Sequence, residues 1–558
     1  MNFGTYTALE QFASRVLEIT NRYSSFNHVS YDPGNFCGKC TRYPAYGDFP
    51  ETYALRKYGK WWKLTEANYQ KPYRETDIDP LGVEDFVTVR FNEPVIPTRL
   101  FIYETYSPGS IVRIWGRLDK GRWVLMWEGK PQYCTPVARK FQPVLRKLSC
   151  FIDTIRLELN CSGLNHHACF DAILLIGFSG PGTEFQMQCL KALNAPLRGP
   201  TTDDEVRQEV DRVNHFDKLP PELKLYIFRF LDLKSLSMCA CVSSGWNKLA
   251  IDPLLYQNIS FKEYWQVVDS RVFDFLEKKC EVLKKLDLSW CGRDDQNFAR
   301  KLYQFLHWSC YNLTHISLEN ATYFNGSHLT AICSSCSELE ELRLKNVYIS
   351  DLIYVHAETV CKLTKLVTLD LGCTNISSHL LIPLLMTNPN LTYLNLDFCE
   401  IGPLDELVRV ISEYNTKLRG FSCWKGRRLT ASSANLLGRC HQLEDLDLGW
   451  CLNAFPEEDT LEGLAKGCRG LRRLIISAWR PLVDSMLFPI IQHCTGLEQL
   501  DVLSITGITP EFVERALLRL PKLKLLEVSY CDSISLKRVQ QWRTMYPHVT
   551  IQKCLEID

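Results

Sequence analysis

The chain has no excess of charge of either sign and no long basic run. Lys and Arg total 64 and Asp and Glu total 64, so the formal net charge at pH 7 is zero. A chain without net charge lacks the electrostatic field that steers proteins to nucleic acid, and without a basic tract it is not held on anionic lipid. We therefore expect no nucleic-acid partner.

Long apolar runs and a signal-peptide pattern are also missing. No stretch reaches the roughly 18 apolar residues that a membrane-spanning helix needs. The 24 cysteines would indicate a disulfide framework only in a short secreted chain, and these 558 residues show no secretory leader. We expect free, buried thiols, and a chain of this length has room for three or four domains.

Catalytic signatures are absent as well. The sequence contains no GxSxG, HExxH or Walker A motif, and no GxGxxG between a strand and a helix. Cys37 and Cys40 have metal-ligand spacing, and His166, His167 and Cys169 could complete a zinc site, but a single CxxC is weak support. We predict no catalytic residue, cofactor or metal, and leave metal binding at the CxxC pair open.

Residues 1–44 are interpreted as an N-terminal helix and its lead-in. Acidic Glu10 and Glu18 argue against a mitochondrial presequence, which is basic and poor in acids. Between residues 6 and 20, four apolar residues recur at the spacing of one helix face: Leu9, Phe12, Val16 and Ile19.

Residues 45–180 carry short alternating apolar runs separated by Gly and Pro. This pattern predicts antiparallel strands in a sandwich or jelly roll, an all-β domain. Residues 181–214, with several Gly and Pro around one acidic run, are predicted to be a partly flexible linker. The clearest strand runs are 86–91, 99–104, 111–115, 123–127, 154–159 and 170–176.

Residues 215–261 predict a small helical module. Pro220 lies at a predicted helix start, where its missing N–H costs nothing, and Asp252-Pro253 ends the module. A module of about 40 residues holds little core of its own, so surplus apolar surface indicates docking onto a partner. The apolar positions of its three predicted helices include Leu219, Leu223, Ile227, Leu231, Leu236, Val242 and Trp246.

Residues 262–558 repeat an LxxLxL-type block about every 27 residues, which predicts a solenoid with one short concave strand and one convex helix per repeat. Residues 256–261 are interpreted as a degenerate opening strand and 549–551 as a closing one. The blocks at Leu418 and Leu471 depart from the pattern, so curvature there is not predicted. The blocks begin at Leu283, Leu313, Leu339, Leu366, Leu391, Leu418, Leu443, Leu471, Leu497 and Leu523.

Cysteines occupy regular positions in these repeats. A small, weakly polar side chain suits each corner of a stacked coil, so we predict structural thiols. One cysteine precedes the block by three residues in six copies, and another follows the strand in four. The two sets are Cys280, Cys310, Cys336, Cys440, Cys468 and Cys494, and Cys291, Cys399, Cys451 and Cys531.

Acidic and aromatic residues gather on the predicted concave strands and turns. Aromatic rings beside charges are typical of protein-binding hot spots. It is equally open that the acids are merely solvated and that the rings pack between repeats. The candidate substrate-binding residues are Asp287, Trp290, Asp370, Phe398, Trp424, Asp447, Trp450, Asp501 and Tyr530.

The module at 215–261 resembles an F-box, from Leu219-Pro220 and Glu222-Leu223 through Ile227-Phe228 to Asp252-Pro253. The resemblance implies docking onto the Skp adaptor of a cullin–RING ubiquitin ligase. Its implied adaptor-binding residues, which contact the adaptor or support the helices that do, are Leu219, Pro220, Leu223, Ile227, Leu231, Leu236, Val242 and Trp246.

Two further resemblances extend this one. The cysteine-bearing repeats resemble the leucine-rich repeats found after F-boxes. Residues 58–62, 104–114 and Asp171-Ala172 resemble a discoidin, or galactose-binding-like, domain, whose fold does not identify a ligand. Trp61 or Trp62 could bind one, or both could pack under the sheet.

This domain order is similar to the mitochondrial F-box and leucine-rich-repeat protein 4 family. The similarity implies a non-catalytic substrate receptor of a Skp-cullin-F-box ligase that promotes ubiquitination and proteasomal degradation of mitophagy receptors at the mitochondrial outer membrane. That family's targeting extension is not evident here, so we expect a cytoplasmic location, peripheral association with that membrane, or both. The alternatives are a non-degradative adaptor-binding scaffold and a glycan- or lipid-binding protein acting through the β domain.

Overall fold

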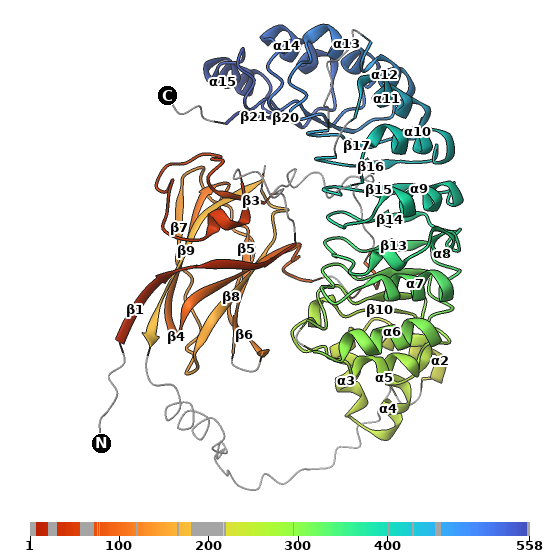
Figure 1. Ribbon diagram of the computed structural model, residues 1–558. Helices are drawn as coiled ribbons and strands as arrows, with labels where there is room; N and C mark the ends of the chain where they lie inside the picture. Colours follow the sequence, from red (N-terminus) through yellow and green to blue (C-terminus); the bar gives the residue numbers. More distant parts are fainter. Residues whose placement is uncertain are drawn as a thin grey trace.

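The protein combines a β domain, three short helices and a curved array of strands and helices (Figure 1). The β domain lies on the concave side of the array. The predicted linker at 181–214 lies outside the residues that the computed structural model describes. These residues are 7–20, 31–55, 72–74, 76, 79–118, 121–164, 167–179, 216, 219–293, 295–399, 401–426, 429–451 and 459–554.

The β domain is built on one long strand, β4 (Asp85–Tyr106), which pairs antiparallel with β8 and β9. The predicted runs 86–91 and 99–104 are two parts of β4, and the other four runs also form strands, which confirms the all-β prediction. The remaining strands are β1 (Thr7–Phe12), β2 (Arg15–Ile19), β3 (Tyr53–Leu55), β5 (Ile111–Arg117), β6 (Trp123–Glu128), β7 (Arg139–Phe141), β8 (Ile152–Leu159) and β9 (Ala168–Ser179), with the 3-10 turn η1 (Pro33–Phe36).

The prediction of an N-terminal helix is wrong. Residues 7–12 form β1, which pairs with β9, and residues 15–19 form β2, which pairs with β4. In β1, Leu9 and Phe12 lie on opposite faces and pack into two different apolar clusters, so both faces of the strand are covered. Pairing with distant strands outweighed the local helical preference. The β domain therefore includes residues 7–19, ahead of the start predicted at residue 45.

Three helices follow, as predicted: α2 (Pro221–Phe228), α3 (Leu233–Ala240) and α4 (Ser244–Ala250). Pro220 is the N-cap residue of α2, and Asp232 and Ser243 cap the next two helices by accepting backbone N–H groups. Asp252 caps the 3-10 turn η5 (Pro253–Tyr256) through the Leu254 N–H, so the chain leaves the module where the sequence predicts.

The repeat array is a parallel sheet whose described strands run in chain order from β10 to β21. Its strands are β10 (Asn258–Ser260), β11 (Lys285–Asp287), β12 (His315–Ser317), β13 (Glu341–Arg343), β14 (Thr368–Asp370), β15 (Tyr393–Asn395), β16 (Gly420–Ser422), β17 (Asp445–Asp447), β18 (Arg473–Ile475), β19 (Gln499–Asp501), β20 (Leu525–Glu527) and β21 (Thr550–Gln552). The opening strand β10 and the closing strand β21 confirm the predicted ends. β16 and β18, from the two irregular copies, pair with their neighbours in unbroken register.

Helices cover the convex side of this sheet (Figure 1). The helices and 3-10 turns between the strands are η6 (Lys262–Tyr264), α5 (Val272–Glu277), α6 (Phe298–Trp308), α7 (Gly326–Ser335), η7 (Leu352–Tyr354), α8 (Ala357–Val360), α9 (Ser378–Thr387), α10 (Leu404–Tyr414), α11 (Ala431–Leu436), η8 (Leu437–Arg439), α12 (Glu462–Gly467), α13 (Asp484–His493), α14 (Pro510–Arg519) and α15 (Leu536–Met545). The arrangement confirms the predicted solenoid, in which each repeat buries its apolar face against its neighbours.

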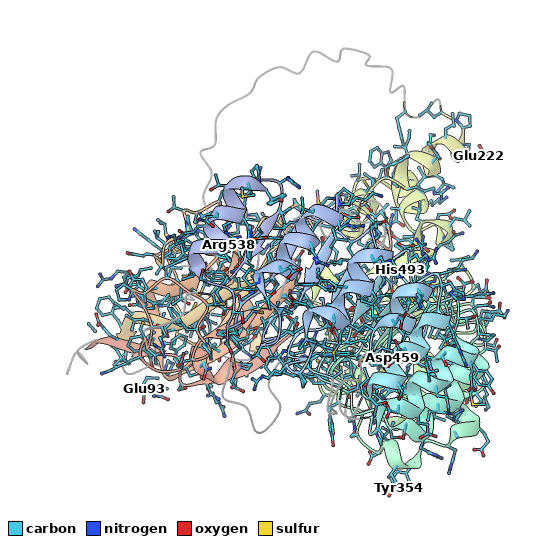
Figure 2. All side chains as sticks on the ribbon, turned by 90° about the horizontal axis from the view of Figure 1, so that it is seen from above. Glu93, Glu222, Tyr354, Asp459, His493 and Arg538 are labelled. Carbon is cyan, nitrogen blue, oxygen red and sulfur yellow. The ribbon has the colours of Figure 1, made fainter. Side chains whose placement is uncertain are left out.

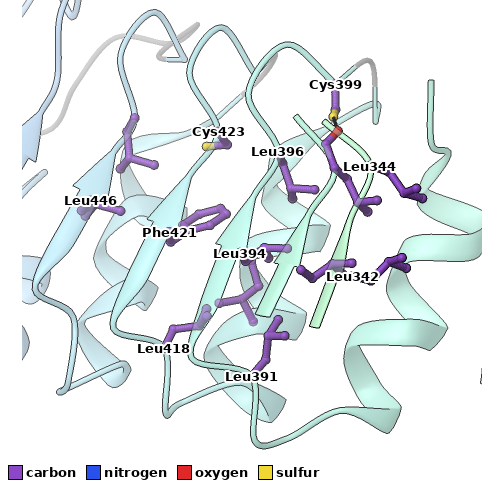
Figure 3. Close-up of a cluster of buried hydrophobic side chains, with 14 of the residues drawn as sticks. Leu342, Leu344, Leu391, Leu394, Leu396, Cys399, Leu418, Phe421, Cys423 and Leu446 are labelled. Carbon is purple, nitrogen blue, oxygen red and sulfur yellow. Dashed lines mark hydrogen bonds between the residues drawn. The ribbon is translucent and has the colours of Figure 1, made fainter. Parts of the chain in front are cut away.

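The core of the solenoid is a stack of equivalent side chains. Leu342, Leu394, Phe421 and Leu446 occupy the same strand position in four repeats and are buried (Figure 3). Cysteines fill the corners, and those after the strands donate to a carbonyl of the preceding coil, as Cys399 Sγ does to Leu371 O at 2.9 Å. Burial raises the pKa of Cys399 to about 12, as expected for a structural thiol and not for a reactive one.

Candidate functional site

The three short helices expose an apolar surface, which we call the α2–α3 patch. Leu223, Ile227, Phe230, Met238 and Val242 are each between 43% and 64% exposed. An apolar cluster on so small a helical module indicates a protein-docking surface. Glu222 of α2 lies at an outer corner of the molecule, away from Glu93 of the β domain (Figure 2).

A small aromatic core supports the α2–α3 patch from below. Phe228 is buried, and its ring lies 5.5 Å from that of Trp246, which in turn packs on Phe216 at 5.1 Å. Leu236 is fully buried. The ring contacts hold α2 and α4 together beneath the exposed residues.

The eight predicted adaptor-binding residues thus divide by exposure. Pro220, Leu223, Ile227 and Val242 are exposed and available to a partner. The other four, Leu219, Leu231, Leu236 and Trp246, are half-buried or buried and support the helices. Whether any of them contacts an adaptor stays a prediction.

Sequence reasoning missed two aromatic members of this surface. Tyr226 of α2 and Phe230, two residues beyond its end, are more than half exposed and have ring centroids 5.2 Å apart. Their spacing of four residues was a usable signal, because i and i+4 side chains share one face of a helix. The sequence motif includes leucine positions but neither of these two aromatic residues.

The predicted acidic ladder has a structural role in the repeats. Asp287 and Asp370 are buried, and each accepts a hydrogen bond from the backbone N–H two residues further on, at 2.9 and 3.1 Å. The same bond recurs at Asn395, Asp447, Asp501 and Glu527. The four carboxylates of Asp287, Asp370, Asp447 and Asp501 are buried and cap the turn that follows each strand, so they are not merely solvated. Their contact with a substrate stays a prediction.

Burial also changes the acidity of these groups. It raises the pKa of Asp370 to about 6, and it raises the pKa of Asp287 above its usual value. Desolvation disfavours the charged form of a carboxyl, and here it outweighs the hydrogen bonds that favour it.

The predicted aromatics stand on strained backbone. In ten repeats the residue three positions after the ladder residue has positive φ, and four of these residues are Trp290, Phe398, Trp450 and Tyr530. Left-handed backbone is disfavoured for such side chains, so the repeat fold imposes it. We call this line of ten residues the turn row.

The β domain packs against the turn row at both ends of the solenoid. Phe86 of β4 packs edge-on against Trp290 with ring centroids 5.0 Å apart, and the Tyr31 hydroxyl lies 3.1 Å from that of Tyr530. Between them, Asn346 donates to the carbonyl of Ile19 at 2.6 Å. These contacts between distant segments hold the β domain against the solenoid, although the linker predicted at 181–214 suggested that it is less firmly oriented than the repeats.

Arg156 is the centre of the first of these contacts. Its guanidinium carbon lies 3.4 Å from the ring centroid of Phe86, 3.6 Å from that of Trp265 and 5.0 Å from that of Trp290. The Trp265 indole donates to Glu158 at 3.0 Å. Burial lowers the pKa of Arg156 to about 9, although the Glu158 carboxylate opposes the shift. The arginine is thus a buried cation held by aromatic faces from both domains.

The middle of the turn row retains an exposed aromatic group. Phe398 and Trp424 pack with centroids 4.8 Å apart, and Trp450 is 44% exposed. The Lys425 ammonium lies 4.7 Å from the Trp424 ring centroid, 5.1 Å from that of Phe398 and 5.9 Å from that of Trp450. We call these four residues the central aromatic patch; of the nine predicted substrate residues, it contains three.

The candidate zinc ligands named from the sequence do not gather into one site within the described residues. Cys37 and Cys40 belong to no cluster of three metal-ligating groups within the described residues, and His166 lies outside them. His167 and Cys169 instead meet Asp48, with one ligand atom from each within 4.8 Å of the others. Among all the residues that the structure describes, no helix is long and apolar enough to span a membrane.

Comparison with known proteins adds to this geometry. Residues 216–262 match the F-box-like family model, and residues 387–404 match a leucine-rich-repeat model. The chain is 28% identical to F-box/LRR-repeat protein 4 of Bos taurus over 584 aligned residues, which cover 97% of this chain and 91% of the bovine protein.

Solved structures are more distant. The yeast Rad7 and Elc1 complex shares 15% identity over 66% of this chain and 93% of that one, with a TM-score of 0.34. An internalin from Listeria monocytogenes shares 14% identity over 51% of this chain and 83% of its own, with a TM-score of 0.32. Because these TM-scores are low, the fold is assigned from the strands and helices described above and not from these two structures. By the family-model matches, the repeat array and the likeness along nearly the whole chain, the protein is similar to F-box and leucine-rich-repeat proteins, F-box/LRR-repeat protein 4 among them.

Proposed function

We propose that this protein is a substrate receptor of a Skp-cullin-F-box ubiquitin ligase. The observation that carries the proposal is the exposed α2–α3 patch, which lies within the residues that match the F-box-like model. Aliphatic and aromatic side chains left in water on a module of this size are stabilised by covering them with a partner. The partner we propose is a Skp-type adaptor.

Such a receptor needs no bond chemistry of its own. It holds a protein substrate near the ubiquitin-charged enzyme, and the high effective concentration of substrate lysines accelerates transfer. The rigid contact between helices, solenoid and β domain supports this role because a fixed geometry preserves that concentration. We therefore propose a non-catalytic protein without a catalytic cofactor.

The central aromatic patch is the proposed substrate contact. Trp450 is exposed, while Trp290 and Tyr530 are already in contact with the β domain. Lys425 adds a positive charge among three rings. A partner segment that carries an acidic residue beside an apolar one could pair its acid with Lys425 and pack its apolar side chain on the rings.

Adaptor binding is tested by charge substitutions on the α2–α3 patch. Ile227→Glu and Val242→Glu should each lower recovery of a purified Skp adaptor at least tenfold, because a charge would be buried in an apolar interface. Ile353→Glu, at an 85% exposed position on η7, is the matched control and should bind normally. Undiminished recovery by both patch variants would refute the assignment.

The degradative role needs a test in cells. Affinity purification with a neddylation inhibitor present should recover substrates with wild type and with Ile227→Glu, but the adaptor only with wild type. If adaptor binding is lost and no bound protein accumulates, a non-degradative scaffold is the better description. The same experiment on Trp450→Ala should recover adaptor but less substrate.

The finer proposal is control of mitophagy receptors at the mitochondrial outer membrane. Similarity to F-box/LRR-repeat protein 4 along 97% of the chain supports it. Depletion of the protein should raise mitophagy receptor levels, and re-expression of wild type but not of Ile227→Glu should restore them. Unchanged receptor levels would remove this part of the proposal and leave the ligase role standing.

A further inference from the structure

Four potential metal ligands converge where the β domain meets the last repeat. Asp48 precedes β3, His167 and Cys169 lie at the start of β9, and Cys554 follows β21 of the solenoid. Asp48, Cys169 and Cys554 are buried, and the His167 side chain is 12% exposed. The cluster therefore joins segments as far apart in the sequence as residues 48 and 554.

The Asp48 carboxylate is the centre of this cluster. The His167 Nε2 lies 2.9 Å from its Oδ2, and the thiols of Cys169 and Cys554 donate to Oδ1 and Oδ2, each at 3.2 Å. A tetrahedral zinc ion with bond lengths of about 2.0–2.3 Å would place neighbouring ligand atoms roughly 3.3–3.8 Å apart. The three contacts of Asp48 are shorter than that spacing by about half an ångström. One ligand atom each of Asp48, His167 and Cys169 lies within 4.8 Å of the others, and Cys554 joins this group through its hydrogen bond to Asp48.

We propose that Asp48, His167, Cys169 and Cys554 form a zinc site that fastens the β domain to the end of the solenoid. Two sulfurs, one imidazole nitrogen and one carboxylate oxygen are a ligand set typical of zinc, whereas Ca²⁺ and Mg²⁺ prefer oxygen alone. On binding, both thiols release their protons to solvent and the neutral imidazole donates a lone pair. The inference is independent of the proposed ligase function.

The surroundings of the cluster support this chemistry. A divalent ion bound at this cluster would favour the thiolate form of Cys169 and Cys554. The Tyr106 ring lies 5.3 Å from His167, and the Tyr530 hydroxyl reaches the Asp48 carbonyl at 3.5 Å. These rings limit water and hold the ligands in place.

Metal content of the full-length protein tests the proposal. Wild type, purified under reducing conditions from zinc-supplemented medium, should carry about one zinc per chain by elemental mass spectrometry. Cys169→Ser and Cys554→Ser should each lose at least four fifths of it. Cys531→Ser, which removes a buried thiol of the neighbouring repeat, is the control and should retain the metal.

A second measurement keeps the test valid if a variant folds poorly. Metal-stripped wild type titrated with Co²⁺ should develop a thiolate-to-cobalt charge-transfer band that saturates at one equivalent and disappears when zinc is added. No band together with no zinc would overturn the proposal, as would equal zinc in wild type and both serine variants. A Cys169–Cys554 disulfide found by mass spectrometry would also overturn it. Adaptor recovery reports separately on the proposed function.

Discussion

Two apolar surfaces of this protein have similar composition but differ in their exposure to solvent. The α2–α3 patch is exposed to solvent, whereas Trp290 on the first repeat is buried under Phe86 of the β domain. Both contain large apolar side chains beside charges, which is the usual description of a binding surface. The difference shows that an intramolecular domain can occupy part of a concave surface, so only the uncovered part remains for another protein.

The largest loss of stability is expected when Arg156, which lies between the two domains, is removed. Arg156→Ala takes away the cation between the two domains and leaves Glu158 buried, so we expect a loss of about 3–5 kcal/mol in the free energy of unfolding. Urea denaturation measures it. Arg409→Ala, in an exposed ion pair on α10, is the control and should cost about 0.5 kcal/mol or less. Equal effects would mean that the domains are not held together at Arg156.

Trp290 and Trp450 form a matched pair, because the first is covered by the β domain and the second is partly exposed. Trp290→Ala should destabilise the fold by about 3 kcal/mol because it empties a covered position, whereas Trp450→Ala should cost about 1 kcal/mol because Trp450 is 44% exposed. Thermal unfolding of the two variants provides the measurement. If Trp450→Ala proved as destabilising as Trp290→Ala, the central aromatic patch would be part of the core.

The acidic ladder gives a pH test of burial. Asp370 has a pKa of about 6 when folded, above that of an unfolded Asp, so the folded state binds more protons between about pH 4 and 6. Stability from this residue is therefore present at low pH and lost as pH rises through about 6. Asp370→Asn, which can still accept from the Gly372 N–H, should gain about 1–3 kcal/mol at pH 7. Urea unfolding at pH 5 and 7 should show the gain shrinking at the lower pH; a loss of stability would contradict a solvation-dominated shift. Exposed Glu514→Gln is the control.

The smallest effect is expected on the open surface. Val242→Ser should change the free energy of unfolding by about 0.5 kcal/mol or less, because the side chain is 64% exposed, while weakening adaptor binding. Calorimetry of the free protein, followed by titration with the adaptor, separates the two quantities. A large stability loss would show that Val242 supports the helices instead of facing a partner.

Local rules predicted much of this fold. Leu286, Leu342 and Leu446 are buried at the strand positions that the LxxLxL period assigns, and β10 and β21 close the array where degenerate copies indicate. The helical module was also predictable, since Pro220 and Asp252 lie at its start and end. Such features depend on side chains a few residues apart, or one repeat apart, whose spacing can be read directly.

Other features could not be predicted from local spacing. Residues 7–19 have an apolar pattern that suits a helix and become strands because β4 and β9 offer open edges. The candidate substrate residues Trp290 and Tyr530 share the turn row with Trp450, yet their neighbours Phe86 and Tyr31 come from a separate domain. The contact between Asp48 and Cys554 could not be predicted either, because the two residues are 506 positions apart and belong to no common sequence pattern.

The sequence by itself therefore determined the order of the parts: a β domain, three short helices and a solenoid of about 27-residue repeats. It also determined which side chains each repeat buries, because that choice follows from periodicity. The tertiary structure alone decided which apolar surface stays open, which acids are buried as turn caps, and which thiols meet a carboxylate. These outcomes depend on the burial of groups hundreds of residues apart, and burial sets both their exposure and their pKa values.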